Sequence, residues 1–179
     1  QQGMYAAVLT IAATQMSTAS PVDFSNLVEQ VSPAVVSVNV VKKMTQEELL
    51  QQQVPEILRR LFGNQVIIPQ QQGPQEKTAY GSAFFISKDG YLVTNHHVIA
   101  DASRISVTLN DRRELDATLV GSDERTDVAV LKVTGGNFPE LKIGDVNQLK
   151  VGEPILAIGS PFGFDYSASA GIVSAKSRN

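Results

Sequence analysis

From residue 79 onward, apolar and polar side chains alternate in short runs. The segments ISVTL (105–109) and LDATL (115–119) both repeat at every second residue, which is the period of a half-buried β-strand. The segment AVVSVNVV (34–41) is rich in β-branched residues and is bounded by Pro33 and by a lysine pair. The pattern predicts strands at 34–41, 79–87, 91–95, 104–109, 114–121, 127–133, 154–159 and 167–174.

These strands are short and are separated by turn residues, which favours an antiparallel barrel or sandwich. Six of them precede the pair Gly135-Gly136, which we interpret as the boundary between two barrels, and two follow it. A short helix is expected before the first strand, because apolar residues recur at helical spacing from Phe24 to Val31. Asp23 is its expected cap and Pro33 its expected end.

The segment 44–77 differs in composition from the rest of the chain. It holds nine of the fourteen glutamines, mixed with prolines, which predicts a long loop rather than a core element. Thr45 and Glu48 have the spacing of a capping box, and EILRRLFG after Pro55 predicts a helical turn that ends at Gly63. The sequence allows two interpretations of this segment, a functional loop and a solvated spacer.

Residues 1–22 carry no charged side chain, and the segment MYAAVLTIAA (4–13) is apolar but too short to span a bilayer. Ser17 and Ala19 follow it at signal-peptidase spacing. We interpret 1–20 as a residual signal-peptide segment that lacks its basic beginning, so that the mature protein would start near Ser20 and be exported. The alternative is an apolar N-terminal segment of the fold.

Composition narrows the function classes further. With 42% hydrophobic and 18% charged residues, the chain has the composition of a globular protein. Fifteen Lys and Arg stand against eighteen Asp and Glu, and no basic block occurs, which argues against nucleic acid as a partner. The absence of cysteine excludes disulfides, thiol catalysis and cysteine-ligated zinc.

One histidine and one aspartate are candidates for catalytic residues. His97 lies at the predicted end of one strand, and Asp127 begins another. In nucleophilic hydrolases, a histidine takes the proton of a serine while a carboxylate orients its ring, and the order His then Asp matches the chymotrypsin type. By spacing alone the signal is weak, since a single histidine at the end of a strand is more often structural and Asp127 could simply form the turn before its strand. A metal site at His96-His97 is disfavoured, because adjacent strand residues point to opposite faces.

Five segments together resemble the HtrA (Do/DegP-like) family of trypsin-like serine proteases. The resemblance implies an all-β, chymotrypsin/trypsin-like double β-barrel, with His97 as general base and Asp127 as its orienting carboxylate. It also implies unfolded protein or peptide substrates, a periplasmic location, and no metal or organic cofactor. The matching segments are DFSNLVEQVSPAVVSV (23–38), GSAFFISKDGYLVTNHHVIADA (81–102), LVGSDERTDVAVLKV (119–133), LKIGDVNQLKVGEPILAIGSPFG (141–163) and SAGIVSAKSR (169–178).

The same resemblance implies a trimer-based homo-oligomer. In the family the N-terminal helix packs trimers together, and the long loop after the first strand reaches toward neighbouring active sites. Phe24 and Leu27 occupy the first of these places in this chain, and Arg59 to Phe62 occupy the second.

The chain departs from the family pattern in several places. The serine motif Gly-Asn-Ser-Gly-Gly does not occur in the sequence, and we expect it, together with any PDZ domain, beyond Asn179. No serine of this chain is therefore assigned as nucleophile. Ala83 and Ser177 replace usual glycines, where an added Cβ is expected to cause local strain, and His96 replaces a usual asparagine.

The expected function is that of a serine endopeptidase of periplasmic protein quality control, with the second barrel incomplete in this chain. The alternative is a non-catalytic protease-like module for chaperone-type substrate binding or oligomer assembly. The expected division is a signal segment at 1–20, the helix and first strand at 21–43, the Gln/Pro-rich loop at 44–77, the remainder of the first barrel at 78–135 and the start of the second at 136–179.

We predict that limited proteolysis cuts first within 44–77, because Gln-rich sequence broken by prolines buries little apolar surface. Mass spectrometry of the earliest fragments checks this. Protection of 44–77 in the monomer, with first cuts at 104–133, would contradict the loop assignment.

Overall fold

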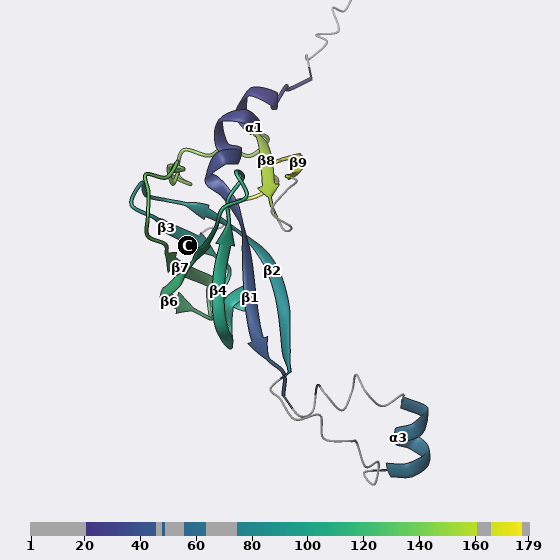
Figure 1. Cartoon of the computed structure of the whole chain (residues 1–179). Coiled ribbons are helices and arrows are strands. Elements are labelled where there is room, and N and C mark those ends of the chain that lie inside the picture. Colours follow the sequence, from purple (N-terminus) through teal and green to yellow (C-terminus); the bar gives the residue numbers. More distant parts are fainter. Residues whose placement is uncertain (1–20, 46–47, 49–55, 64–74, 161–165, 177–179) are drawn as a thin grey trace, which may run out of the picture.

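The computed structural model describes residues 21–45, 48, 56–63, 75–160 and 166–176 (Figure 1). The predicted signal segment, most of the Gln-rich loop and Ser177 lie outside the described residues. The elements in chain order are α1 (Ser25–Val31), the 3₁₀ helix η1 (Ser32–Ala34), β1 (Val35–Lys43), α3 (Glu56–Phe62), β2 (Glu76–Phe85), β3 (Tyr91–Thr94), α4 (His96–Ile99), β4 (Ala102–Thr108), β5 (Glu114–Asp116), β6 (Thr118–Asp123), β7 (Val128–Lys132), β8 (Pro154–Gly159) and β9 (Ser167–Ile172).

Seven strands form one curled antiparallel sheet in the order β5-β4-β1-β2-β3-β7-β6. Only Ala117 separates β5 from β6, and its backbone N–H donates to the carbonyl of Ile105 at 2.9 Å. Because β5 pairs with β4 while β6 pairs with β7, this bent strand joins the two edges of the sheet. The expected single strand 114–121 is therefore two strands, and its break closes the first barrel.

The inward face of the barrel is apolar. Val36, Val38 and Val40 of β1 are fully buried, as the alternating pattern predicts. Each such side chain contributes about 1.5–3 kcal/mol relative to an exposed one. Phe85 of β2 stacks on Phe138 with ring centroids 4.6 Å apart, which fastens the segment after β7 to the same core.

The last two strands form a separate sheet, in which β8 pairs antiparallel with β9. This agrees with the two strands predicted after Gly135-Gly136, although β9 ends at Ile172 rather than at 174. A two-stranded sheet is only marginally stable by itself. It is attached to the first barrel where the Ser160 backbone N–H donates to the Ser82 hydroxyl of β2 at 2.9 Å.

The predicted N-terminal helix is present, but both of its ends differ from the expectation. Phe24 is the N-cap residue, while the Asp23 carboxylate lies one position earlier and accepts the Ser25 backbone N–H at 2.9 Å. The α-helix stops at Val31 and the chain continues into η1, which contains Pro33 near its start. Proline fits there because the first positions of a helix need no N–H donor.

The capping box and the helical turn predicted in the long loop are both present among the described residues. Thr45 and Glu48 exchange the two backbone-to-side-chain hydrogen bonds of a capping box, at 3.0 and 3.3 Å. The ion pair with Lys77, helped by Thr45, lowers the pKa of Glu48 to about 2. The strand β2 begins at Glu76, which pairs with Lys43 of β1, and not at the predicted residue 79. The sequence did not predict this start because residues 76–78 are all polar and show no alternation.

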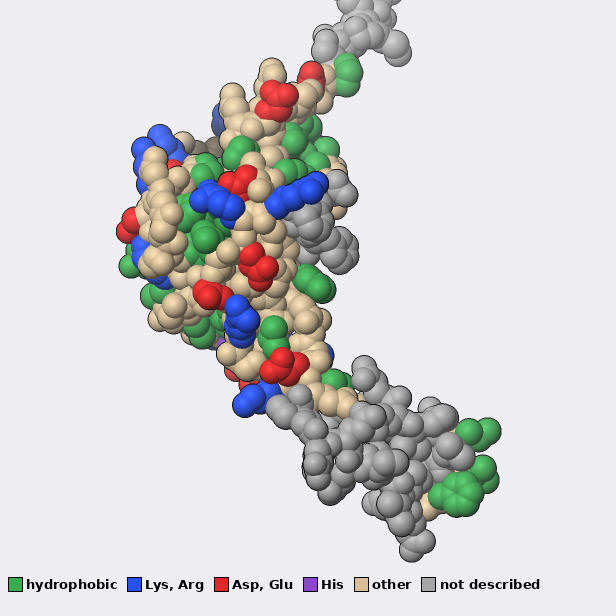
Figure 2. All heavy atoms as spheres, in the orientation of Figure 1, with side chains coloured by type: hydrophobic (Ala, Val, Ile, Leu, Met, Phe, Trp, Pro, Cys, Tyr) green, Lys and Arg blue, Asp and Glu red, His purple; other side chains and the backbone are tan. Residues whose placement is uncertain are grey.

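The helix α3 ends before Gly63, which has a positive φ of 58°, as its sequence predicts. Figure 1 draws α3 beyond the end of the β1–β2 hairpin, and Figure 2 shows apolar side chains at that end of the molecule. Ile57, Leu61 and Phe62 of α3 are all exposed. No helix within the described residues is both long enough and apolar enough to cross a membrane.

Gly81 of β2 sets how closely α4 approaches the sheet. A Cβ at this position would lie 2.7 Å from Cγ1 and 2.9 Å from Cγ2 of Val98, closer than such atoms can pack. The helix α4 therefore packs directly on the backbone of β2. The placement of the residues on α4 depends on this contact.

We predict that Gly81→Ala lowers the free energy of unfolding by about 1–3 kcal/mol, because the stiff Val98 side chain cannot make room without moving α4. Gly121→Ala in β6 is the matched control, since a Cβ there meets no atom within 4 Å. Urea unfolding measures both variants. Equal stability of the two variants would show that the Gly81 contact does not constrain α4.

Candidate functional site

The two sequence-predicted site residues lie next to each other. Thr94 of β3 is paired with Ala129 of β7. Asp127, two positions before Ala129, therefore lies against the turn that follows β3. His97 lies on that turn, and Asp127 directly precedes β7. The histidines do not close a strand as expected, because 96–99 form the short helix α4.

His97 and Asp127 make two hydrogen bonds. The ring Nδ1 of His97 lies 2.7 Å from Oδ2 of Asp127, and the backbone N–H of His97 donates to Oδ1 at 2.8 Å. The side chains are 71% and 43% exposed, so the pair lies at the surface of the barrel. Since Nδ1 is engaged by the carboxylate, Nε2 is the nitrogen that can exchange a proton with another group.

The backbone of Asp127 is unusual. Its φ is 55°, in the left-handed region that aspartate tolerates better than most residues. Its carbonyl accepts hydrogen bonds from the side-chain amide of Asn95 at 3.1 Å and from the backbone N–H of His96 at 3.2 Å. The segment 95–97 therefore contacts both the main chain and the carboxylate of Asp127.

The same contacts stabilise the charged carboxylate. The backbone hydrogen bond from His97, followed by its side-chain hydrogen bond, lowers the pKa of Asp127 below its ordinary value, and the charges of His97 and His96 add to this. At neutral pH the Asp127 carboxylate is therefore ionised and accepts the His97 Nδ1–H.

His96 differs from its neighbour. It is half-buried, and its Nδ1 atom is buried without a hydrogen-bond partner among the described residues. Only the side chain of His97 reaches the Asp127 carboxylate. In the described ranges, no three His, Cys, Asp or Glu side chains come together as metal ligands would.

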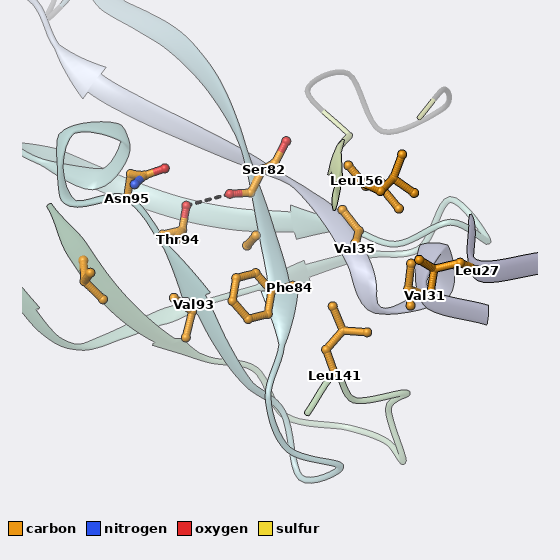
Figure 3. Close-up of a pocket in the computed structure, with 13 residues that line it drawn as sticks. Leu27, Val31, Val35, Ser82, Phe84, Val93, Thr94, Asn95, Leu141 and Leu156 are labelled. Atoms are coloured by element: carbon orange, nitrogen blue, oxygen red, sulfur yellow. Dashed lines mark hydrogen bonds between the residues drawn. The ribbon is translucent and has the colours of Figure 1, made fainter. Parts of the chain in front are cut away.

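A cavity of about 460 Å³ is lined by residues of α1, of the barrel and of β8, and it includes Asn95 and Val128, near neighbours of the pair in the chain, but neither His97 nor Asp127. Figure 3 shows its wall of aliphatic side chains, with the hydrogen bond from the Thr94 hydroxyl to the Ser82 carbonyl at 2.8 Å. Asn95 lines the end of the cavity. The sequence did not indicate this cavity, since its residues come from segments far apart in the chain. Its apolar lining includes Leu27, Val31, Val35, Phe84, Val93, Leu141 and Leu156.

Ala83 does not carry the strain expected where the family has glycine. It lies within β2, opposite Val36, and is not among the described residues with positive φ. Its side chain is 2% exposed and packs in the core of the barrel. The added Cβ therefore fills core space in ordinary strand geometry.

Comparisons with protein families, with individual relatives and with solved structures all find proteases. A family model described as a trypsin-like peptidase domain matches residues 81–179. A probable periplasmic serine endoprotease, DegP-like, from Hahella chejuensis is 50% identical over 164 residues, covering 88% of this chain and 34% of the relative. A protein of the same description from Pseudomonas putida (strain W619) is 48% identical over 188 residues, covering 98% of this chain and 39% of the relative.

Solved structures are similar as well. The HtrA-type protease AlgW with tripeptide is 34% identical, with a TM-score of 0.64, and the match covers 88% of this chain and 41% of that one. An HtrA-type protease solved with a decapeptide is 37% identical, with a TM-score of 0.68, and the match covers 88% of this chain and 46% of that one. The chain thus spans less than half the length of each of these proteins.

We predict that the carboxyl group of Asp127 titrates below its ordinary pKa of 3.8. Its ionised form then stabilises the fold above the unfolded-state pKa, and this contribution is lost as the pH falls through the folded-state pKa. In a ¹³C NMR titration, His97→Ala should raise the pKa of Asp127 only partly, because the backbone N–H at 97 remains.

His96→Asn is the control for this titration and should cause the smaller change, since His96 acts on the carboxylate only through its charge. An Asp127 carboxyl group that titrates at its ordinary value, or that His97→Ala leaves unchanged, would contradict the observed pairing.

Proposed function

Because the chain belongs to the HtrA (DegP-like) family of trypsin-like serine proteases, we propose that it supplies the general base and the orienting carboxylate of a serine endopeptidase site. The observation that carries the proposal is the pairing of His97 Nδ1 with Asp127 Oδ2 at 2.7 Å. Together with the second hydrogen bond from the His97 N–H, it fixes both the tautomer and the orientation of the ring.

In the proposed mechanism His97 Nε2 takes the proton of the serine Oγ as that oxygen attacks the peptide carbonyl, and later gives the proton to the leaving amine. The imidazolium that forms in between is stabilised by the ionised Asp127. The lowered pKa of Asp127 supports this role, because the carboxylate stays charged when the ring becomes charged.

We propose that the nucleophile comes from outside these 179 residues; the absence of a Gly-Asn-Ser-Gly-Gly motif from the sequence supports this. The proposed function therefore has two parts. The barrel prepares the base and the carboxylate, whereas the serine and the oxyanion donors come from polypeptide that this chain does not contain. The 179-residue chain alone is expected to hydrolyse no protein.

The proposed setting is protein quality control in the periplasm, with unfolded proteins or peptides as substrates. The relatives from Hahella chejuensis and Pseudomonas putida are described as probable periplasmic serine endoproteases, which supports the periplasmic location and the endoprotease activity. A trimer-based homo-oligomer is part of the proposal. Exposed apolar side chains on two separate helices, Leu27 of α1 and Leu61 and Phe62 of α3, support it.

A chimera tests the proposal. Residues 21–179 replace the matching segment of the Pseudomonas putida relative, which retains its own remaining sequence. We expect the chimera to digest casein, and His97→Ala to lower its kcat by about 10³-fold or more, because the base is lost while binding remains. His96→Asn should keep most of the activity, since its side chain does not reach Asp127.

Circular dichroism verifies that each variant is folded, and the 179-residue chain is assayed in parallel. Activity of the His97→Ala chimera together with loss of activity in His96→Asn would overturn the assignment of the base. A folded chimera that binds unfolded casein without cleaving it would instead support the non-catalytic module. Casein digestion by the 179-residue chain, blocked by a serine-directed phosphonate, would contradict the external origin of the nucleophile.

A further inference from the structure

We propose that Asn95 is a positioning residue that holds the main chain of Asp127 in its left-handed conformation, and thereby aims the carboxylate at His97. The inference rests on the proposed function only in so far as that carboxylate serves the site. It concerns a side chain whose amide donates to the Asp127 main chain rather than to the ring of His97.

Asn95 occupies the N-cap position of α4 but does not act as a cap. Asparagine at this position usually accepts a backbone N–H from the first turn of its own helix, and Asn95 makes no such hydrogen bond. The His97 N–H is instead accepted by the carboxylate of Asp127, from the other side of the β3–β7 pair. The Asp127 carboxylate thus caps α4 in place of the Asn95 side chain. The amide group of Asn95 makes its hydrogen bond elsewhere.

The partner of the Asn95 amide is the carbonyl of Asp127. A carbonyl can only accept hydrogen bonds, so the amide nitrogen of Asn95 has to face it, at 3.1 Å. The backbone N–H of His96 donates to the same oxygen at 3.2 Å. Two donors from adjacent residues therefore converge on one carbonyl and fix the peptide plane that follows Asp127.

The held carbonyl matters because its carbon is one of the four atoms that define φ of Asp127, and this φ is 55°, a conformation that costs energy for any residue with a Cβ. On the other side of the residue, the Asp127 N–H makes only a long hydrogen bond of 3.3 Å to Glu124. Without the hydrogen bond from the Asn95 amide, a rotation of Asp127 toward negative φ would lower the conformational energy of the backbone. Such a rotation turns the Cα–Cβ bond and moves the carboxylate away from His97.

Substitution by aspartate separates this role from simple capping. Aspartate caps helices as well as asparagine does, so a capping role predicts that Asn95→Asp behaves like the wild type. Aspartate cannot donate, however, and its carboxylate would face the carbonyl oxygen of Asp127. The proposed role predicts that Asn95→Asp is at least as damaging as Asn95→Ala.

The first test uses the 179-residue chain labelled with ¹⁵N-histidine and observes the His97 ring nitrogens by NMR, with the resonances assigned from His96→Asn. We expect the ¹⁵N chemical shifts of the wild-type His97 ring to report the Nδ1–H tautomer, and those of both Asn95 variants to shift toward the Nε2–H tautomer. Asn39→Ala is the matched control, because it removes an asparagine hydrogen bond of 2.8 Å to Thr108 elsewhere on the barrel.

Retention of the wild-type ¹⁵N chemical shifts in Asn95→Asp would reduce Asn95 to an ordinary cap and overturn the proposal. A change of these shifts in Asn39→Ala to the same degree would show a general destabilisation and would overturn it as well. The measurement needs no nucleophile, so its outcome does not depend on whether the proposed protease function is correct.

The second test is a double-mutant cycle in the chimera described above. Asn95→Ala should lower kcat by about 10-fold or more with KM unchanged, since a small displacement of a catalytic group is enough for such a loss. In an Asp127→Asn background, which keeps a residue tolerant of left-handed φ, Asn95→Ala should cause no further loss. Independent, additive losses in an active chimera would overturn the role of Asn95 while leaving the protease function intact.

Discussion

The contact between the turn after β3 and the main chain of Asp127 is the interaction on which the candidate site depends. Pairing of β3 with β7 brings the two segments together, and Gly81 lets α4 lie against β2. Within that frame, the Asp127 carboxylate and carbonyl accept four hydrogen bonds from residues 95–97. The barrel thus holds a histidine ring and a carboxylate in a fixed relation at its surface.

The exposure of the His97–Asp127 pair limits the strength of its hydrogen bond. His97 is 71% exposed, and an exposed hydrogen bond competes with water. Asn95, which donates to the Asp127 carbonyl, lines the apolar cavity, whose wall also includes Leu156 and Ile158 of β8. Any polypeptide that covered the His97–Asp127 pair would exclude water and strengthen the electrostatic interaction between the carboxylate and the ring.

Much of the fold follows from the sequence, because the two-residue period records which side chains face the core. The valines of β1 are buried as predicted, and His97 and Asp127 are brought together as the family resemblance implies. What the sequence did not indicate depends on tertiary contacts. The helix α4 is too short for a periodic signal, the break at Ala117 reflects pairing to both edges, and the positive φ of Asp127 is held by residues thirty positions away.

The most direct test of the central claim, that this barrel supplies the base and carboxylate of a serine hydrolase site, measures activation of the nucleophile itself. In the chimera, the rate at which a fluorophosphonate labels the serine reports its nucleophilicity without any contribution from protein substrate binding. We expect the labelling rate to fall steeply in both His97→Ala and Asp127→Ala. Labelling at the unmodified rate in both folded variants would contradict the claim.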